Sequence, residues 1–539
     1  MAIQSKVFDG ARSYDVCVIG AGPLGLATAL ECESLGLSVL VLESGGLTPA
    51  GSADVEPYGV VVDPSRHAPV DVAVCRALGG SSWWWGGRCV PMDPVDFEPR
   101  DFVPGSGWPI SQADIAPYEA TAAQYLDCGS NQFIDPHTSW AGLGDGVHVT
   151  ALERWSRTRE MALYHGERLR ASQNIDVCLG TTVDTIDVKD EKVVGLLTES
   201  GQSVNAKSYV LAAGGLGTAK LLQRHLQKAP EAFGGTNGAL GRYYMGHTHG
   251  KIADIKLDDP SDAGSLDFYL DDTGTWVRRR LSIDAETQKS QRILNTAFWV
   301  DNAAFHDYRH GSGILSAVYL ALLIPPVGRL LVAEGIRRMH VGAGGNILRH
   351  LGNVVMHPLA TALSAWQILR QRYVEKPRRP GFLIRNKSGR YALTYHGEQL
   401  PIRESAATLD PDGTLRVDLR FTRADAESVV KAHDLVDKSL RAAGKGRLEY
   451  HMPEVYRADA VLAQATDGFH QEGLVRMGMN PATSVVDAQC RVHGLANLYV
   501  ASTGIFPTSG QANPTFTACA LAVRLAHFIA AKGGEHASN

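Results

Sequence analysis

Residues 14–46 read YDVCVIGAGPLGLATALECESLGLSVLVLESGG. The apolar run at 16–19 predicts a buried parallel strand, and the helical spacing of the apolar residues after it predicts a helix that ends near Gly36. A second apolar run, residues 38–42, predicts the next strand. A strand, a glycine-rich turn, a helix and a second strand in this order indicate a Rossmann-like α/β unit.

The turn of this unit carries the residues of a dinucleotide site. Gly20 permits a tight turn, Gly22 lets the backbone approach a pyrophosphate, and Gly25 permits close helix–strand packing. The N-terminus of the helix favours phosphate charge. Glu43 ends the second strand, where its carboxylate can accept hydrogen bonds from a ribose diol and would repel a 2′-phosphate. The motif by itself fits NAD and FAD, and an α/β turn that binds nothing is the plainer alternative.

Two more segments have a similar order of elements. Residues 208–222, SYVLAAGGLGTAKLL, predict a strand, a glycine-rich turn and a helix. Residues 497–530 predict a strand, a long polar loop and a closing apolar helix. Because nucleotide-type turns occur at both ends and in the middle of the chain, we expect one long cofactor held by segments that are distant in sequence.

The composition of the 539 residues is typical of a globular protein, with 44% hydrophobic and 20% charged residues. A net charge of −5 argues against general nucleic-acid binding. The eight cysteines are scattered without a CxxC pair, which favours a reducing compartment. The first fifteen residues have no apolar stretch and no run reaches eighteen apolar residues, so we expect no signal peptide, no membrane span and a cytoplasmic protein.

Seven further motifs follow along the chain: RALGGSSWWWGGR (76–88), GWPIS (107–111), VLAAGGLGTAKLL (210–222), LGRYYMGHTHG (240–250), FHQEGLVRMG (469–478), TSVVDAQCRVHGLANLYVAS (483–502) and FPTSGQANPT (506–515). Together with the N-terminal unit they resemble, in order and over most of the chain, the glucose–methanol–choline (GMC) family of FAD-dependent oxidoreductases. Within that family the chain looks most like the pyranose oxidases and the bacterial glycoside 3-oxidases. The resemblance implies an α/β, Rossmann-like FAD-binding domain built from discontinuous segments, and an α+β substrate-binding domain with a sheet and flanking helices.

The resemblance also places His470 and Asn513 against the flavin as the catalytic residues. Imidazole titrates near neutrality, so His470 is expected to take the hydroxyl proton of an alcohol while flavin N5 takes the hydride. Asn513 cannot act as a base, but its amide can donate a hydrogen bond to the substrate oxygen. Asn513 would equally suit the cap of a last helix that starts at Pro514, whose positive end would face the flavin. His470, next to Phe469, could otherwise be an ordinary core histidine.

The expected FAD-binding residues come from the N-terminal unit, the loop near residue 80, the central turn and the C-terminal loop. They are Gly20, Gly22, Pro23, Leu24, Gly25, Glu43, Ser44, Arg76, Gly80, Ser81, Ser82, Trp85, Gly86, Gly87, Val183, Ala213, Gly214, Thr503, Gly504, Pro514 and Thr515. No metal is expected. His247 and His249 could approach the pocket, whereas His493 is expected to be structural.

The loop GGSSWWWGGRC (79–89) resembles the flavin-facing loop of the family. Trp83 and Trp84 would either lie against the flavin or the substrate, since sugar faces stack on indole, or fill the core between the domains. Several sugar and choline oxidases attach FAD covalently to a histidine here. No histidine occurs between His67 and His137, so we predict non-covalent FAD.

We expect the FAD-binding domain to comprise residues 1–109, 165–250 and 465–539, and the substrate-binding domain residues 110–164 and 251–464. Within the latter, residues 313–380 are unusual, because nine Lys and Arg and only two acids occur between Arg329 and Arg379. A helical insertion, serving as a lid or oligomer arm, is one interpretation. A basic segment that meets a membrane surface or an acidic partner is the other.

The predicted function is FAD-dependent oxidation of a secondary hydroxyl of a sugar or glycoside, at C3 or C2, to a keto-sugar. Oxygen or another electron acceptor would reoxidise the flavin, and a homo-oligomer is left open. One alternative is oxidation of a non-sugar alcohol, which an apolar pocket would favour. A further alternative is a lyase or decarboxylase that keeps FAD in the same fold.

Overall fold

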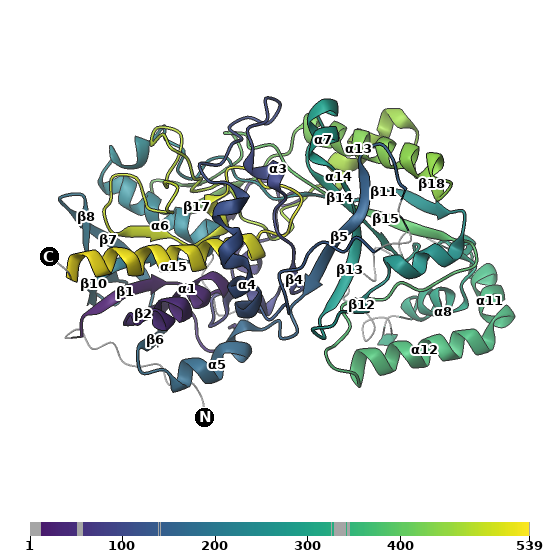
Figure 1. Cartoon of the computed structure of the whole chain (residues 1–539), viewed down its shortest axis with the longest axis horizontal. Coiled ribbons are helices and arrows are strands. Elements are labelled where there is room, and N and C mark those ends of the chain that lie inside the picture. Colours follow the sequence, from purple (N-terminus) through teal and green to yellow (C-terminus); the bar gives the residue numbers. More distant parts are fainter. Residues whose placement is uncertain are drawn as a thin grey trace.

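The computed structural model describes residues 12–50, 58–137, 140, 142–324, 326–327, 341 and 345–537. They form two main layered bodies that lie side by side, one around a parallel sheet and one around a larger antiparallel sheet (Figure 1). The first body contains both described ends of the chain, and the second is built from its middle.

The parallel sheet is the Rossmann-like core that the sequence predicted. Its five strands pair in the order β19 (Leu498–Val500), β10 (Ala206–Leu211), β1 (Tyr14–Ile19), β2 (Val39–Glu43) and β6 (Ile175–Leu179). β1 and β2 are buried almost throughout, which explains why their sequences are continuous apolar runs. The helices of this body are α1 (Pro23–Ser34), α2 (Val70–Ala73), α3 (Pro94–Phe97), α4 (Ala116–Tyr125), α5 (Met161–Ala171), α6 (Gly214–Lys228) and α15 (Thr515–Ala537).

The antiparallel sheet has the strand order β18 (Gly446–Tyr450), β11 (Thr248–Leu257), β15 (Arg390–Gly397), β14 (Thr296–Asp301), β13 (Trp276–Ile283), β5 (Val147–Trp155) and β4 (Arg88–Cys89), with β12 (Tyr269–Leu270) paired to β13. Alternate residues of its strands, such as Phe298 and Leu393, pack into a core with α13 (Arg423–Ala442) and α14 (Arg457–Gln464). α7 (Ala285–Gln291) follows β13. Because side chains alternate along a strand, Trp299 and His396 point to the opposite face of this sheet.

Two small sheets complete the nucleotide side: β7 (Val183–Lys189), β8 (Lys192–Thr198) and β9 (Ser203–Val204) in one, and β16 (Ala406–Leu409), β17 (Leu415–Asp418) and β3 (Gly59–Val61) in the other. The boundary between the two bodies differs from the domain boundary that the sequence predicted. Ala122 of α4 and Val417 of β17 are buried in the same core as the parallel sheet, although the sequence placed both in the substrate-binding domain. α4 packs on α15, and β17 pairs with β3, so tertiary contacts override their position in the chain.

α15 has the length and apolar composition to cross a membrane, with a mean hydropathy of 1.2 over Thr515–Gly533. However, 61% of that window is buried, and the helix packs against α1 and α4. It is the closing core helix that the sequence predicted. Part of the unusual basic segment, from Arg329 on, falls in residues 328–340 and 342–344, which lie outside the described residues; its described part forms α8 (Gly313–Leu322), α11 (Ile347–Met356) and α12 (Pro358–Tyr373).

Candidate active site

The first turn after β1 has the geometry that its three glycines predict. Gly20 has a φ of +104°, and a Cβ there would lie 2.6 Å from the carbonyl oxygen of Ala212. A Cβ on Gly25 would lie 2.0 Å from the carbonyl oxygen of Gly20. Gly22 differs, because it has an ordinary φ of −70° and no described atom lies within 4 Å of the Cβ position. The space beside Gly22, at the N-terminus of α1, is therefore open to a ligand.

Glu43 holds this turn from the end of β2. Its Oε2 accepts a hydrogen bond of 2.8 Å from the backbone N–H of Ala21, and its Oε1 accepts one of 2.8 Å from Gly45. Burial raises the pKa of the Glu43 carboxyl, and these two hydrogen bonds oppose that rise. Oε1 also accepts from the Ser44 hydroxyl over 3.4 Å, whereas Oε2 keeps a further lone pair that can accept from a ribose hydroxyl.

A cavity opens beside this turn and extends to His470. Fifteen of the predicted site residues line it: Gly20, Gly22, Pro23, Leu24, Glu43, Ser44, Arg76, Gly80, Ser81, Ala213, Gly214, Thr503, Pro514, Thr515 and His470. The sequence reasoning missed nine other lining residues: Tyr58, Ala73, Val74, Cys75, Ala212, Gly215, Phe469, Gln471 and Ala501. Most of these are neighbours of predicted residues, and proximity in the chain could have indicated them. Tyr58 carries no such signal.

Several predicted cofactor residues lie behind the cavity wall instead. Ser82 accepts from the backbone N–H of Met161 and donates to the Gly79 carbonyl, so it braces the loop. Gly86 faces a different cavity beside Trp155, and Gly504 packs on Gly215. Gly25, Trp85, Gly87 and Val183 also do not line the nucleotide cavity.

The three tryptophans of the 79–89 loop have different surroundings. The indole of Trp83 donates to the Leu78 carbonyl over 2.8 Å, and that of Trp85 donates to the Arg159 carbonyl over 2.7 Å. Both pack against the core of the first body, whereas Trp84 is exposed. The position of Gly80 shows why glycine precedes the tryptophans. Its φ is +51°, and a Cβ there would lie 2.8 Å from Gly22 Cα. The loop thus needs glycine where it touches the nucleotide turn.

His470 and Asn513 meet as predicted from the resemblance, with 3.2 Å between the Asn513 side-chain amide and His470 Nε2. α15 begins at Thr515, two residues after Asn513. The backbone before His470 is left-handed at Gly468 (φ +57°) and at Phe469 (φ +60°). A left-handed phenylalanine is strained, which is typical of a segment held for function.

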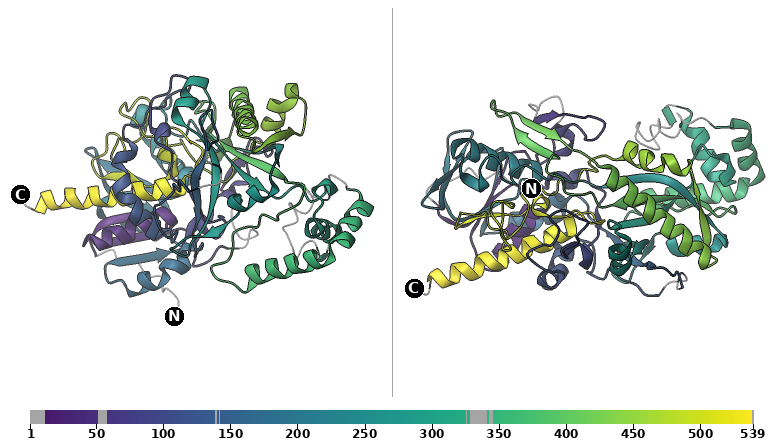
Figure 2. Two further views of the ribbon diagram at one scale, coloured as in Figure 1. Left: turned by 45° about the vertical axis from the view of Figure 1, so that its right-hand side comes forward. Right: turned by 90° about the horizontal axis from the view of Figure 1, so that it is seen from above.

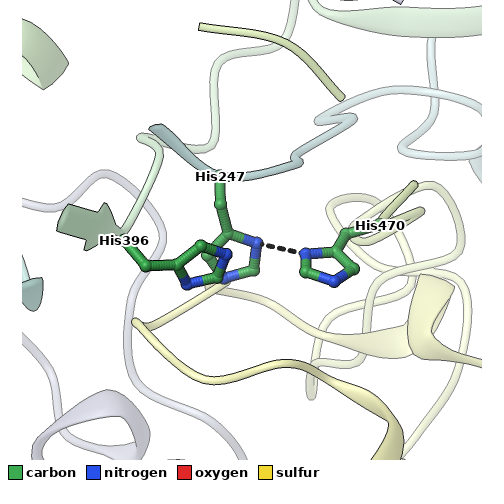
Figure 3. Close-up of side chains that lie close together, drawn as sticks. All are labelled: His247, His396 and His470. Atoms are coloured by element: carbon green, nitrogen blue, oxygen red, sulfur yellow. Dashed lines mark hydrogen bonds between the residues drawn. The ribbon is translucent and has the colours of Figure 1, made fainter. Parts of the chain in front are cut away.

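Two further histidines complete a cluster with His470 (Figure 3). His247 Nδ1 lies 2.8 Å from His470 Nδ1 and shares a hydrogen bond with it. His396, from β15, stacks on the His247 ring with 4.2 Å between ring centres, and its Nδ1 donates to the Gln511 carbonyl over 2.7 Å. We call His247, His396, His470 and Asn513 the catalytic cluster. No motif pointed to His396, because β15 and β11 meet only in the folded sheet.

The cluster is electrically neutral. Burial, then the charges of Arg88 and His249, lower the pKa of His470 to about 3. Burial also lowers the pKa of His247 and His396 well below the usual value, and neighbouring histidines add to the shift. A neutral His470 has a lone pair on one ring nitrogen, as a general base requires.

Glu472 lies behind the cluster, with 3.7 Å between its Oε1 and His247 Nδ1. It is fully buried, and neither carboxylate oxygen has a hydrogen-bond partner among the described residues. Burial, then Asp96 and Glu398, raise the pKa of Glu472. Its position two residues after His470 in the FHQEGLVRMG motif was a signal that the sequence reasoning did not use.

The ring nitrogens of His247, His396 and His470 are close enough together to hold a metal ion. The hydrogen bonds argue against one. His247 and His470 share a proton between their Nδ1 atoms, so these two nitrogens cannot both direct lone pairs at one ion. The Nδ1 atom of His396 is engaged with a backbone carbonyl.

The face of the antiparallel sheet next to the cluster is polar and aromatic. The Arg88 guanidinium lies 4.3 Å from the centre of the Trp299 ring, and that ring lies 6.2 Å from the ring of His396. Arg88 also approaches Glu153 to 3.3 Å. Asp301 accepts from the Trp299 indole over 3.2 Å. The side chains of Arg88 and Asp301 are partly exposed and can offer hydrogen bonds to a polar substrate, whereas Trp299 is buried between the guanidiniums of Arg88 and Arg278.

The cavity fits a flavin dinucleotide on three structural grounds. The space at Gly22 and the N-terminus of α1 suits a pyrophosphate. Glu43 suits a ribose. Phe469, in the cavity wall, exposes 58% of its surface, which a flat apolar ring would cover.

Two family models match the chain: "FAD dependent oxidoreductase" over residues 15–280 and "GMC oxidoreductase" over residues 403–522. Three curated relatives are similar in sequence. The 2-methyl-1,2-propanediol dehydrogenase of Mycolicibacterium austroafricanum is 24% identical over 96% of this chain and 95% of its own. The paromamine 6′-oxidase of Streptomyces fradiae is 23% identical over 97% and 92%. The C-glycoside 3-oxidase of Arthrobacter globiformis is 34% identical over 22% and 21%.

Among solved structures, pyridoxine 4-oxidase from "Mesorbium loti" superposes with a TM-score of 0.53 at 16% identity. The superposition covers 95% of this chain and 98% of that one. At this identity the likeness concerns the fold: a Rossmann-like core joined to a second, sheet-based body.

Proposed function

The chain belongs to the GMC family of FAD-dependent oxidoreductases that act on CH–OH groups, and we propose that it oxidises a secondary hydroxyl of a sugar or glycoside, at C3 or C2, to a keto-sugar. The observation that carries the sugar assignment is the pair of partly exposed charged side chains on the sheet face beside the catalytic cluster, Arg88 and Asp301. A polyhydroxylated ring needs hydrogen-bond partners, and a guanidinium and a carboxylate supply donors and acceptors. The relatives named for aminoglycoside and C-glycoside oxidation support the same substrate class.

His470 is the base in this proposal. Because His470 and His247 are joined through their Nδ1 atoms, a proton on His470 Nδ1 leaves its Nε2 with the free lone pair. In the structure Nε2 faces the Asn513 amide, whose nitrogen lies 3.2 Å away. With substrate bound, Nε2 can accept the proton of the substrate hydroxyl instead. Bound FAD supplies the hydride acceptor.

Asn513 and His247 position the reacting groups, which are the substrate hydroxyl and the His470 ring. The Asn513 amide has two N–H groups, so it can donate to the substrate oxygen and hold the hydroxyl beside His470 Nε2. His247 keeps the His470 ring in one tautomer, because the shared proton stays on the Nδ1 side. When His470 gains the substrate proton, the resulting positive charge lies next to a histidine pair backed by the Glu472 carboxyl.

The test is anaerobic mixing of the FAD-loaded protein with sugars, glycosides and their 2-deoxy and 3-deoxy analogues, followed by flavin absorbance. We expect one glycoside to bleach the flavin and the analogue that lacks the reacting hydroxyl to fail. Readmitting air then separates direct reoxidation by oxygen from a need for another acceptor. Bleaching only by aliphatic or aryl alcohols would overturn the sugar assignment.

A non-sugar alcohol is the second candidate, because the relative named for 2-methyl-1,2-propanediol matches nearly the whole chain. A small diol in the same panel distinguishes the two. If no alcohol reduces the flavin, a lyase or decarboxylase that keeps FAD takes precedence.

A further inference from the structure

The helices α11 and α12 carry apolar side chains on their outer surfaces. Ten of the twenty-eight large hydrophobic residues that are exposed in the described chain lie between residues 347 and 374. They are Ile347, Leu348, Leu351, Val355, Met356, Leu359, Leu363, Trp366, Leu369 and Val374, and their exposed fractions range from 45% to 79%. On α12, Leu359, Leu363 and Trp366 follow helical spacing, so they form one stripe.

The inner face of α11 is held to the rest of the protein by hydrogen bonds from polar side chains. His350 of α11 is fully buried and bonds through Nδ1 to the Ser316 hydroxyl of α8 over 3.0 Å, while Nε2 bonds to the His306 carbonyl over 3.1 Å. Asn353 donates to the Tyr308 carbonyl over 2.9 Å. A helix on a protein core normally turns its apolar face inward. α11 instead holds polar side chains inside and presents apolar ones outside, so its outer face is built for an apolar neighbour.

The arrangement places this surface at the far end of the molecule. α11 and α12 lie at the end of the second body opposite the C-terminus of α15 (Figure 1), and the second view shows them projecting from it (Figure 2). The surface is therefore remote from the nucleotide cavity and accessible to something large.

The charge of the segment indicates what that neighbour is. Residues 345–380 contain six Arg and Lys and one acid, Glu375, in a chain of net charge −5. Arg349, Lys376 and Arg378 are exposed. Arg370 pairs with Glu375 and Arg379 with Asp267, so the first three are the cations that a partner could meet. A second copy of the chain would bring an equally basic face against this one, which is repulsive. An anionic lipid surface matches both the apolar stripe and the positive charge. Its acyl chains can contact the apolar side chains, and its anionic headgroups attract the Arg and Lys side chains.

We propose that α11 and α12 form a membrane-docking surface that lies in the plane of an anionic bilayer interface. α11 has 10 residues and α12 has 16, so each is too short to cross the hydrocarbon core and suits an interfacial position. Trp366, on the stripe, is a residue type that prefers the lipid–water interface.

The test is flotation of the FAD-loaded protein with vesicles of phosphatidylcholine alone or with 30% phosphatidylglycerol. We expect flotation with the anionic vesicles, with a loss of at least tenfold at high salt. Leu363→Ser/Trp366→Ser should abolish it, and Lys376→Gln/Arg378→Gln should weaken it several-fold. A matched control, Val194→Ser/Met479→Ser, removes apolar side chains that are equally exposed on other elements and should float like the parent.

Each variant is checked for folding by its flavin spectrum and thermal unfolding. Flotation that is independent of the apolar pair would overturn the proposal, as would protein that stays with the soluble fraction for every vesicle. A soluble dimer that Leu363→Ser/Trp366→Ser converts to monomer in light scattering would identify a second copy as the occupant instead.

Discussion

The turn that holds the dinucleotide and the cluster that faces the substrate are assembled from different lengths of chain. The nucleotide cradle, which we define as Gly20, Gly22, Gly25 and Glu43, lies within one strand–helix–strand unit. In the catalytic cluster, His470 meets a histidine that is 223 residues away in sequence and an asparagine 43 residues away. The cradle depends on what a backbone can do locally. The cluster depends on β11 and β15 of the antiparallel sheet meeting the loops that carry His470 and Asn513.

This difference makes two predictions. A methyl group added to a cradle glycine should destabilise the fold where the new Cβ would meet backbone atoms. Removing a side chain from the catalytic cluster should leave folding unchanged. Substitutions in the two regions should therefore separate folding, cofactor binding and chemistry.

The largest effect is expected for Gly25→Ala. Its Cβ would lie 2.0 Å from the Gly20 carbonyl oxygen, and neither backbone can move without separating α1 from β1. We expect little folded protein, or a melting temperature lowered by many degrees, as measured by circular dichroism. A normal melting curve for this variant would mean that the helix–strand packing is looser than described.

His470→Ala should remove chemistry and leave the fold intact. We expect the rate of flavin reduction by substrate to fall about 10²–10⁴-fold, the usual contribution of a general base. The FAD content and melting temperature should stay within error of the parent, because His470 is supported by neighbours and supports no core. Stopped-flow absorbance gives the rate. Retention of the parental rate would remove His470 from the base role.

Gly22→Ala tests the cradle without disturbing the protein itself. The backbone there is ordinary and no described atom lies within 4 Å of the Cβ position, so the apoprotein should melt as the parent does. The methyl group would occupy the space expected for the pyrophosphate. We expect the dissociation constant of FAD, measured by fluorescence titration, to rise at least about tenfold. Unchanged affinity would place the pyrophosphate elsewhere.

The smallest effect concerns pH. Burial and the charge of Arg88 lower the pKa of His470 to about 3, and a protonated His470 cannot act as a base. kcat/KM should therefore stay level from neutral pH down to about pH 4 and fall only below that. Arg88→Gln removes a positive charge and raises the pKa of His470, so the fall moves to higher pH by about one unit or less.

Arg88→Lys keeps the charge and is the matched control, whose pH profile should follow the parent. An acid limb that does not move in Arg88→Gln would mean that another group sets the profile.

Sequence patterns were enough to predict the parallel nucleotide unit, the need for glycine at Gly20 and Gly25, and, through the family motifs, the pairing of His470 with Asn513. These features follow from local backbone geometry, from apolar periodicity and from motifs with fixed spacing. For the same reason the closing helix α15 could be placed within one residue of its observed start.

No sequence pattern indicated that His396 stacks on His247, that Glu472 lies next to His247, or that Trp84 is exposed while its two neighbours are packed. The tertiary structure also moved α4 and β17 into the nucleotide body. The physical reason is that sheet pairing and helix packing join segments hundreds of residues apart, and no local pattern records which strand will lie beside which. The outward apolar face of α11 and α12 is another feature that the sequence could not predict. Apolar periodicity indicates that a helix is amphipathic, but only the burial of its residues in the folded protein shows which side faces outward.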